Sequence, residues 1–168
     1  MSRISELVDA YAAELALPWR DGLSGGERVW MLVYPPEQER AMRANLARLE
    51  FVTGQSGRGW RSIDITDEFG RWLARHRHAE AFFEEPSDLT LSILDQFEAE
   101  LVSGIRGHLA AASGNDVVSL VGIGSIFPFL RASSVIKAID DAVQGRLLDA
   151  RDGFNYRARV IDPQREIA

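Results

Sequence analysis

The run DVVSLVG, residues 116–122, is almost wholly apolar and rich in valine. A second run of the same kind, WMLVY, covers residues 30–34. Strands that are short and uniformly apolar are typical of a sheet that is covered on both faces. These two segments therefore restrict the chain to an arrangement in which helices pack on each side of a sheet.

Helical patterns around these strands can supply the covering layers. Apolar residues recur at spacings of three and four in a segment that begins at Ser87 or Asp88 and runs to about Ala112, which predicts the longest helix. A shorter pattern with the same spacing lies between Pro128 and Gly145. WRSIDIT, residues 60–66, alternates polar and apolar side chains and predicts a strand nearer an edge. Further helices are predicted after Ser2, Pro36 and Thr66.

The C-terminal part of the chain carries a turn signal between two short strand-like segments. RLLDA (146–150) and NYRARVI (155–161) flank Arg151-Asp152-Gly153, a sequence typical of a hairpin turn. We therefore expect a three-layer α/β fold, with a mainly parallel sheet, helices on both faces and a C-terminal antiparallel hairpin. The length of 168 residues favours a single domain over 1–168.

Composition narrows the classes of site that the chain can hold. It has no cysteine, which excludes disulfides, thiolate catalysis and thiolate metal sites. The net charge of -6 argues against direct nucleic-acid binding, because phosphate neutralisation needs a basic surface. No apolar run approaches the roughly 20 residues of a membrane span, and the N-terminal segment lacks the apolar core of a signal peptide. We expect a cytoplasmic protein that does not bind membranes.

The positive charge of the chain is almost entirely arginine, since Lys137 is the only lysine. Two interpretations are open. Arginine can mark sites for bidentate contacts to carboxylate or phosphate groups. The bias can also reflect general base composition, with the arginines spread over a mixed charged surface.

The strongest predicted strand runs into a glycine turn, Gly122-Ile123-Gly124-Ser125. A strand, a glycine turn and a helix can bind phosphate, because the helix N-terminus offers free N–H groups. The dinucleotide fingerprint requires a third glycine where this chain has Phe127, and the P-loop requires Gly-Lys-Ser/Thr. We interpret the turn as a structural corner and expect no cofactor. The alternative is a degenerate nucleotide-binding domain that uses Gly122, Gly124 and Ser125.

The other catalytic and metal-binding motifs are incomplete. LSGGE, residues 23–27, resembles the signature loop of ABC ATPases, but it precedes a strand and the chain has no P-loop. His76 and His78 do not share a helix face and lack a third ligand, so we expect no metal site. No G-x-S-x-G nucleophile elbow is present. We expect no catalytic residues and therefore no enzymatic activity.

Three stretches together resemble the BrxB family of bacterial BREX phage-defence systems: VWMLVYPPEQE (29–39), VVSLVGIGSIFPFLRASSVI (117–136) and LLDARDGFNYRARVI (147–161). The second is the most specific, because an apolar strand and a G-x-G turn precede Pro-Phe-x-Arg. The resemblance implies a small core BREX component encoded beside a methyltransferase, a PglZ-type protein and an ATPase. It further implies a non-enzymatic adaptor that binds the PglZ-type protein and supports host DNA methylation and phage restriction.

An adaptor needs a surface that docks its partner. The candidates for that contact are Phe127, Pro128, Phe129 and Arg131, since arginine and aromatic residues are enriched at interface hot spots. The last three are also the residues that match the family motif. In the alternative interpretation both phenylalanines belong to the core and Arg131 caps a helix or pairs internally.

Overall fold

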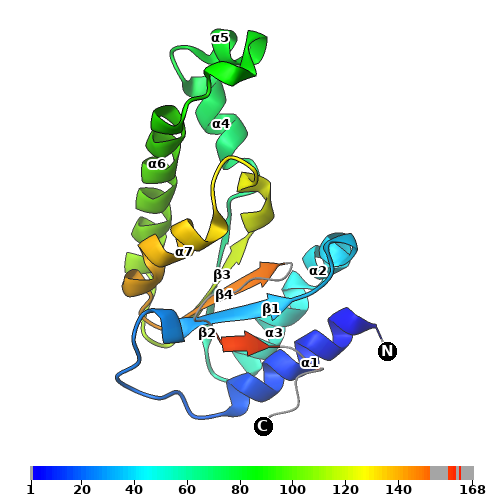
Figure 1. The fold of residues 1–168 in the computed structure, drawn as a ribbon. Helices are drawn as coiled ribbons and strands as arrows, with labels where there is room; N and C mark the ends of the chain where they lie inside the picture. The colour runs from blue at the N-terminus through cyan, green and yellow to red at the C-terminus, as the bar shows by residue number, and fades with distance from the viewer. Residues whose placement is uncertain (1, 152–158, 162, 164–168) are drawn as a thin grey trace.

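The computed structural model describes residues 2–151, 159–161 and 163, and its centre is a five-stranded sheet in the order β2-β3-β4-β1-β5. Every neighbouring pair of strands in this sheet is parallel (Figure 1). The α/β class and the parallel sheet are therefore confirmed. The strands are β1 (Val29–Val33), β2 (Gly59–Asp64), β3 (Asp116–Val121), β4 (Arg146–Arg151) and β5 (Arg159–Ile161).

The inner strands β1 and β3 are buried on both faces, as their uniform apolarity predicts. In β3 every residue after Asp116 is buried, and in β1 only Val33 is partly exposed. The edge strand β2 instead exposes Arg61, Ser62 and Asp64, which agrees with the alternating pattern of its sequence. The apolar content of β1, β2 and β3 thus agrees with their places in the sheet, whereas the central strand β4 also carries Arg146 and Asp149.

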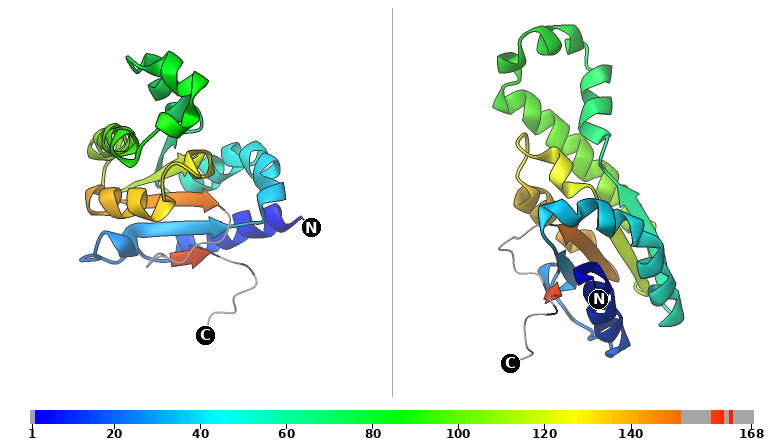
Figure 2. Two further views of the ribbon diagram at one scale, coloured as in Figure 1. Left: turned by 45° about the horizontal axis from the view of Figure 1, so that its top comes forward. Right: turned by 90° about the vertical axis from the view of Figure 1, so that its right-hand side faces the viewer.

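Two layers of helices cover the sheet and form two separate cores. One layer, α1 to α3, packs Tyr11 and Leu49 against Trp30 and Leu148. The other layer, formed by α7 and the carboxyl half of α6, packs residues such as Ile105 against the opposite face (Figure 2). The helices are α1 (Arg3–Ala16), α2 (Glu39–Ala44), α3 (Leu46–Gln55), α4 (Glu68–Arg75), α5 (Ala79–Glu84), α6 (Leu91–Ala110) and α7 (Ala132–Ile139). Short 3-10 turns cover Gly26–Arg28, Pro36–Gln38, Pro86–Asp88, Ile123–Ile126 and Asp140–Ala142.

The longest predicted helix is confirmed as α6, although it begins at Leu91, after a 3-10 turn at Pro86–Asp88. Its carboxyl half packs on the sheet, while its amino half projects beyond the sheet together with α4 and α5 (Figure 2). Aromatic contacts hold α4 to α6: the rings of Trp72 and Phe97 have centroids 5.4 Å apart. No helix among the described residues is long and apolar enough to cross a membrane.

The predicted antiparallel C-terminal hairpin is wrong. Both β4 and β5 run parallel to β1, and β1 lies between them. Leu147 and Leu148 are both fully buried, one in each core, so β4 has the two covered faces of an inner parallel strand. The hairpin prediction rests on the few residues of the turn at Arg151. The position of β4 depends instead on its pairing with β1 and β3, which are distant in the sequence. Arg151 ends β4; Asp152 and Gly153 lie outside the described residues.

A buried hydrogen bond ties α1 to α3 beneath this sheet. The Thr53 hydroxyl donates to the Leu49 carbonyl at 2.7 Å, so the Tyr11 hydroxyl is the donor in its 2.7 Å contact with Thr53 Oγ1. Burial raises the pKa of Tyr11 despite this contact, which keeps the hydroxyl protonated as a donor.

Removing either partner of this bond should destabilise the fold by different amounts. Tyr11→Phe removes a donor and leaves Thr53 with its bond to Leu49, so we expect a loss of about 1 kcal/mol in the free energy of unfolding. Thr53→Val leaves the buried Tyr11 hydroxyl without its acceptor and should lower the free energy of unfolding by about 2–3 kcal/mol. Urea denaturation of both variants measures the difference, and a larger loss for Tyr11→Phe would contradict this assignment of donor and acceptor.

Candidate functional site

A cleft of about 950 Å³ lies at the carboxyl ends of β1, β3 and β4. After β1 the chain continues to α2, and Met42 of α2 packs in the core on one face of the sheet. After β3 the chain continues to α7, and Ile136 of α7 packs in the core on the other face. The two connections therefore depart to opposite faces of the sheet. In open parallel sheets, such a point of divergence at the carboxyl edge is the usual place for a binding crevice.

The glycine turn after β3 forms one wall of the cleft, and its first glycine has a structural role. Gly122 has φ of 88°, and a Cβ at this position would lie 2.4 Å from Thr66 Oγ1. The close approach that requires glycine is therefore made by the protein's own Thr66. Ser125 donates from its backbone N–H (2.9 Å) and from its hydroxyl (2.6 Å) to the Gly122 carbonyl.

Gly124 differs from Gly122 in its surroundings. It is exposed, and a Cβ built on it meets no atom within 4 Å. Gly122, Gly124 and Ser125, the three residues of the nucleotide alternative, thus all line the cleft. Gly124 is the exposed member of the three, and its carbonyl accepts a hydrogen bond from the Phe127 backbone N–H at 3.3 Å.

The four candidates for partner contact have unequal environments. Phe127 is 78% exposed, and Pro128 and Arg131 are exposed as well. The ring of Phe129 instead stacks on Phe69, with centroids 3.9 Å apart. Phe127 is therefore a surface residue and not part of the core, whereas Phe129 is partly buried against Phe69. Contact of these residues with a partner stays a prediction. Phe127 and Arg131 both border the cleft.

The opposite wall of the cleft carries a network of polar side chains. The buried Tyr34 hydroxyl donates to the Glu39 carboxylate. Arg43 Nε donates to Glu39 Oε1 at 2.8 Å, and Arg43 Nη2 donates to Thr66 Oγ1 at 2.9 Å. Thr66 in turn donates from its backbone N–H and its hydroxyl to Asp64. The network joins the segments that follow β1 and β2 into one wall.

The environment of this network sets the charge of its members. Burial raises the pKa of Tyr34, and the hydrogen bond to Glu39 raises it further. Partial burial of Asp64 opposes its ionisation, but the hydrogen bonds from Thr66 and the nearby Arg43 prevail and lower its pKa. At neutral pH the wall therefore holds a neutral tyrosine and an ionised aspartate, whose polar atoms bond to neighbouring side chains.

Sequence reasoning did not find this network or the buried carboxylate near it. Glu39 and Arg43 have the spacing of an i,i+4 ion pair, and that is the one signal the sequence offers. Asp149 is a fully buried acidic residue on β4, in a segment that the sequence predicts as a hairpin arm and not as the centre of a sheet. Its position next to the cleft follows only from the strand order.

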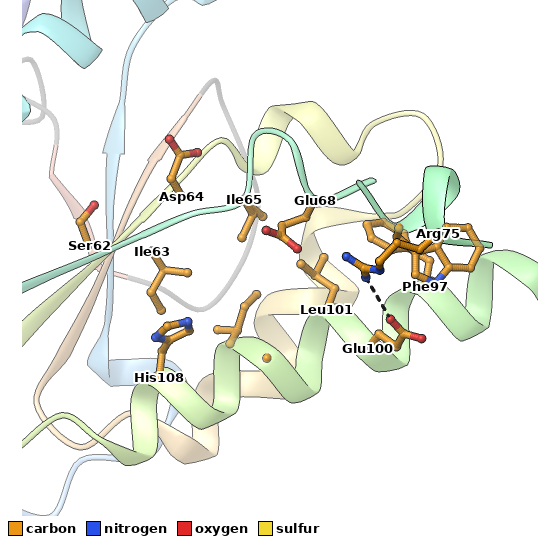
Figure 3. A pocket seen from close by; sticks show the side chains of 13 residues that line it. Ser62, Ile63, Asp64, Ile65, Glu68, Arg75, Phe97, Glu100, Leu101 and His108 are labelled. Carbon is orange, nitrogen blue, oxygen red and sulfur yellow. Dashed lines mark ion pairs between the residues drawn. The ribbon is translucent and has the colours of Figure 1, made fainter. Parts of the chain in front are cut away.

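A second pocket, of about 270 Å³, lies between β2, α4 and α6 (Figure 3). Arg75 and Glu100 form an ion pair across it, with Nη2 and Oε2 3.6 Å apart. Both side chains are largely exposed, so the pair contributes little to stability. Glu68 pairs with Arg71 at 3.4 Å. The charged groups of this pocket are thus bound to close neighbours on the surface.

The histidines after α4 have structural contacts. His76 Nδ1 accepts a hydrogen bond from the His78 backbone N–H at 3.1 Å, and the ring of His76 lies 5.0 Å from that of Phe82. Across the part of the chain that the structure describes, no group of three or more His, Cys, Asp or Glu side chains could hold a metal ion.

Comparisons of the chain with protein-family models, with curated proteins and with solved structures find no match. The resemblance to the BrxB family therefore stays a prediction.

The two glycines of the corner should respond differently to alanine. Gly122→Ala places a Cβ against Thr66 at positive φ, and we expect the free energy of unfolding to fall by about 2–4 kcal/mol. Gly124→Ala is the matched control: it has open space and should change stability by about 0.5 kcal/mol or less. Thermal or urea unfolding measures both, and equal effects would refute the structural role of Gly122.

Proposed function

We propose that this protein is a non-enzymatic adaptor that docks a partner protein at the cleft at the carboxyl edge of the sheet and at its rim. The rim is formed by the exposed residues Phe127 and Arg131. The observation that supports this most strongly is Phe127, a large aromatic side chain left 78% exposed beside a cleft of about 950 Å³. Aromatic residues are enriched at protein interfaces. Aromatic anchors seated in such surfaces supply much of the binding energy.

The rim also defines the chemistry of the partner. Arg131 is exposed at the border of the cleft and offers a guanidinium for bidentate contact to a carboxylate. Phe127 offers an apolar surface a few residues away. The wall formed by Tyr34, Glu39 and Arg43 is already cross-linked by its own hydrogen bonds. The matching partner is a segment that presents an acidic side chain beside an apolar one.

The resemblance to the BrxB family supports one partner in particular. On that basis the occupant of the cleft is the PglZ-type protein of a BREX system, with the methyltransferase or the ATPase as further members of the assembly. The adaptor would hold these components together while the system methylates host DNA and restricts phage. The arrangement of Phe127, Pro128, Phe129 and Arg131 is compatible with this role, since three of the four are exposed.

Substitutions on the rim should weaken the complex without unfolding the adaptor. We expect Phe127→Ala to raise the dissociation constant for the co-encoded PglZ-type protein at least tenfold, about 1.4 kcal/mol. Arg131→Glu should weaken it further by reversing a charge. Because both side chains are exposed, the melting temperatures should stay near that of the wild type. Biolayer interferometry with the purified pair gives the affinities.

The control for this experiment is Phe51→Ala. Phe51 is 64% exposed on α3, outside the lining of the cleft. This variant should bind the partner as the wild type does. Unchanged affinity in Phe127→Ala and Arg131→Glu, with both proteins folded, would exclude the rim as the docking surface.

A nucleotide sensor is the second candidate function. What favours it is the exposed Gly124, which adjoins open space at a point where open α/β sheets bind nucleotides. A ligand that binds only the folded state raises the melting temperature. This candidate therefore predicts a rise at millimolar ATP with magnesium, and loss of that rise in Gly124→Val. No shift in the wild type, with or without magnesium, would eliminate it.

A further inference from the structure

We propose that the opposite, amino-terminal edge of the sheet holds a binding site for a phosphate-like oxyanion, formed by Arg28, Arg58 and Arg146 beside Trp19. Arg146 begins β4, Arg28 directly precedes β1, and Arg58 directly precedes β2. Parallel strands start at the same edge, so the fold gathers three arginines that are far apart in the sequence. This site is independent of the cleft at the carboxyl edge.

Two of the arginines, Arg58 and Arg146, meet around one aromatic ring, while Arg28 bonds to the Val143 and Gln144 carbonyls just before Arg146. The guanidinium carbon of Arg58 lies 3.8 Å from the centroid of the Trp19 ring, and that of Arg146 lies 4.5 Å from it. The same carbon of Arg146 lies 5.8 Å from the centroid of Trp30. Cation–π contacts of this kind compensate part of the cost of bringing like charges together.

Arg146 is the buried member of the cluster. Its side chain belongs to a residue that is only 5% exposed. Its Nη1 donates to the Gly145 carbonyl at 2.9 Å, but its Nε is buried and has no hydrogen-bond partner. The indole Nε1 of Trp19 is likewise a buried donor without a partner. Unmatched buried donors are rare in folded proteins and suggest a group that binds there.

The recorded hydrogen bonds of the three arginines go to neutral groups and not to carboxylates. None of the ion pairs formed within the described ranges involves Arg28, Arg58 or Arg146. Arg28 donates to the carbonyl of Val143 at 2.9 Å, and Arg58 to the side-chain oxygen of Asn115 at 2.7 Å. These acceptors are neutral, so they satisfy donors without cancelling the charge.

The electrostatics of Arg146 agree with this geometry. Burial lowers the pKa of Arg146, and the charges of Arg28 and Arg58 lower it further; Glu14 alone acts in the other direction. Glu14 is itself paired with Arg159, with Nη2 and Oε2 3.2 Å apart. A buried charge without a counter-ion costs several kcal/mol, and a bound anion would offset that cost.

The donor set decides the class of ligand. Guanidinium and indole groups only donate hydrogen bonds, so the ligand must supply acceptors. Three guanidinium groups favour a multiply charged oxyanion, and the arginine fork matches phosphate oxygens in pairs. The shared chemistry is a phosphate group, either as the free ion or as the monoester of a small molecule.

Thermal unfolding in matched salts tests the site. In the wild type, millimolar inorganic phosphate should raise the melting temperature in a saturable way relative to chloride at equal ionic strength. Arg146→Met should abolish this response and, in chloride, should melt no lower than the wild type, because it removes an uncompensated buried charge. Arg77→Gln, which changes an exposed arginine in the segment after α4, should keep the full response.

Further melting-temperature measurements distinguish the possible sources of the ligand, and they distinguish this site from the cleft at the other edge of the sheet. A larger rise with a phosphate monoester such as AMP than with inorganic phosphate would identify an organic phosphate; the reverse would identify the free ion. If Arg146→Met does not fold, Arg58→Gln, a half-buried position, replaces it. Gly124→Val should leave the phosphate response unchanged. Equal melting of the wild type in both salts, or a phosphate response that persists in the arginine variants, overturns the proposal.

Discussion

The parallel pairing of β4 with β3 on one side and β1 on the other is the constraint on which the rest of the structure depends. It gives β4 two covered faces, with Leu147 in one core and Leu148 in the other. Because a parallel strand of this kind needs helices on both sides, the connections after β1 and β3 must leave in opposite directions. The same pairing places all the carboxyl ends of the strands at one edge of the sheet and all the amino ends at the other. The cleft and the arginine cluster are consequences of that polarity.

At the carboxyl edge, the protein's own packing decides which groups face outward. Gly122 allows the segment after β3 to approach Thr66, and Thr66 is also bonded to Arg43. Packing of Phe129 on Phe69 then leaves Phe127 on the surface. A corner whose glycine serves an internal contact is consistent with a protein that works by holding a partner, and the proposed adaptor role uses the residues that this packing leaves exposed.

The extent to which the sequence predicts this structure depends on how local each signal is. The sequence predicts inner strands at residues 30–34 and 116–122 because a strand that is buried on both faces has apolar side chains at consecutive positions. The orientation of β4 was mispredicted because a turn signal at Arg151 is local, whereas the neighbours of a strand are not. The arginine cluster was hidden for the same reason: Arg28, Arg58 and Arg146 come together only through the strand order, and the arginine-rich composition alone left two interpretations open.

Thiol protection in the complex tests the adaptor account most directly, because the chain has no cysteine of its own. Phe127→Cys and Phe51→Cys each introduce one exposed thiol, and the rate of labelling by a maleimide is measured alone and with saturating PglZ-type protein. The account predicts at least tenfold slower labelling at position 127 in the complex and an unchanged rate at position 51. A complex that forms while position 127 is labelled as fast as in the isolated protein would contradict it.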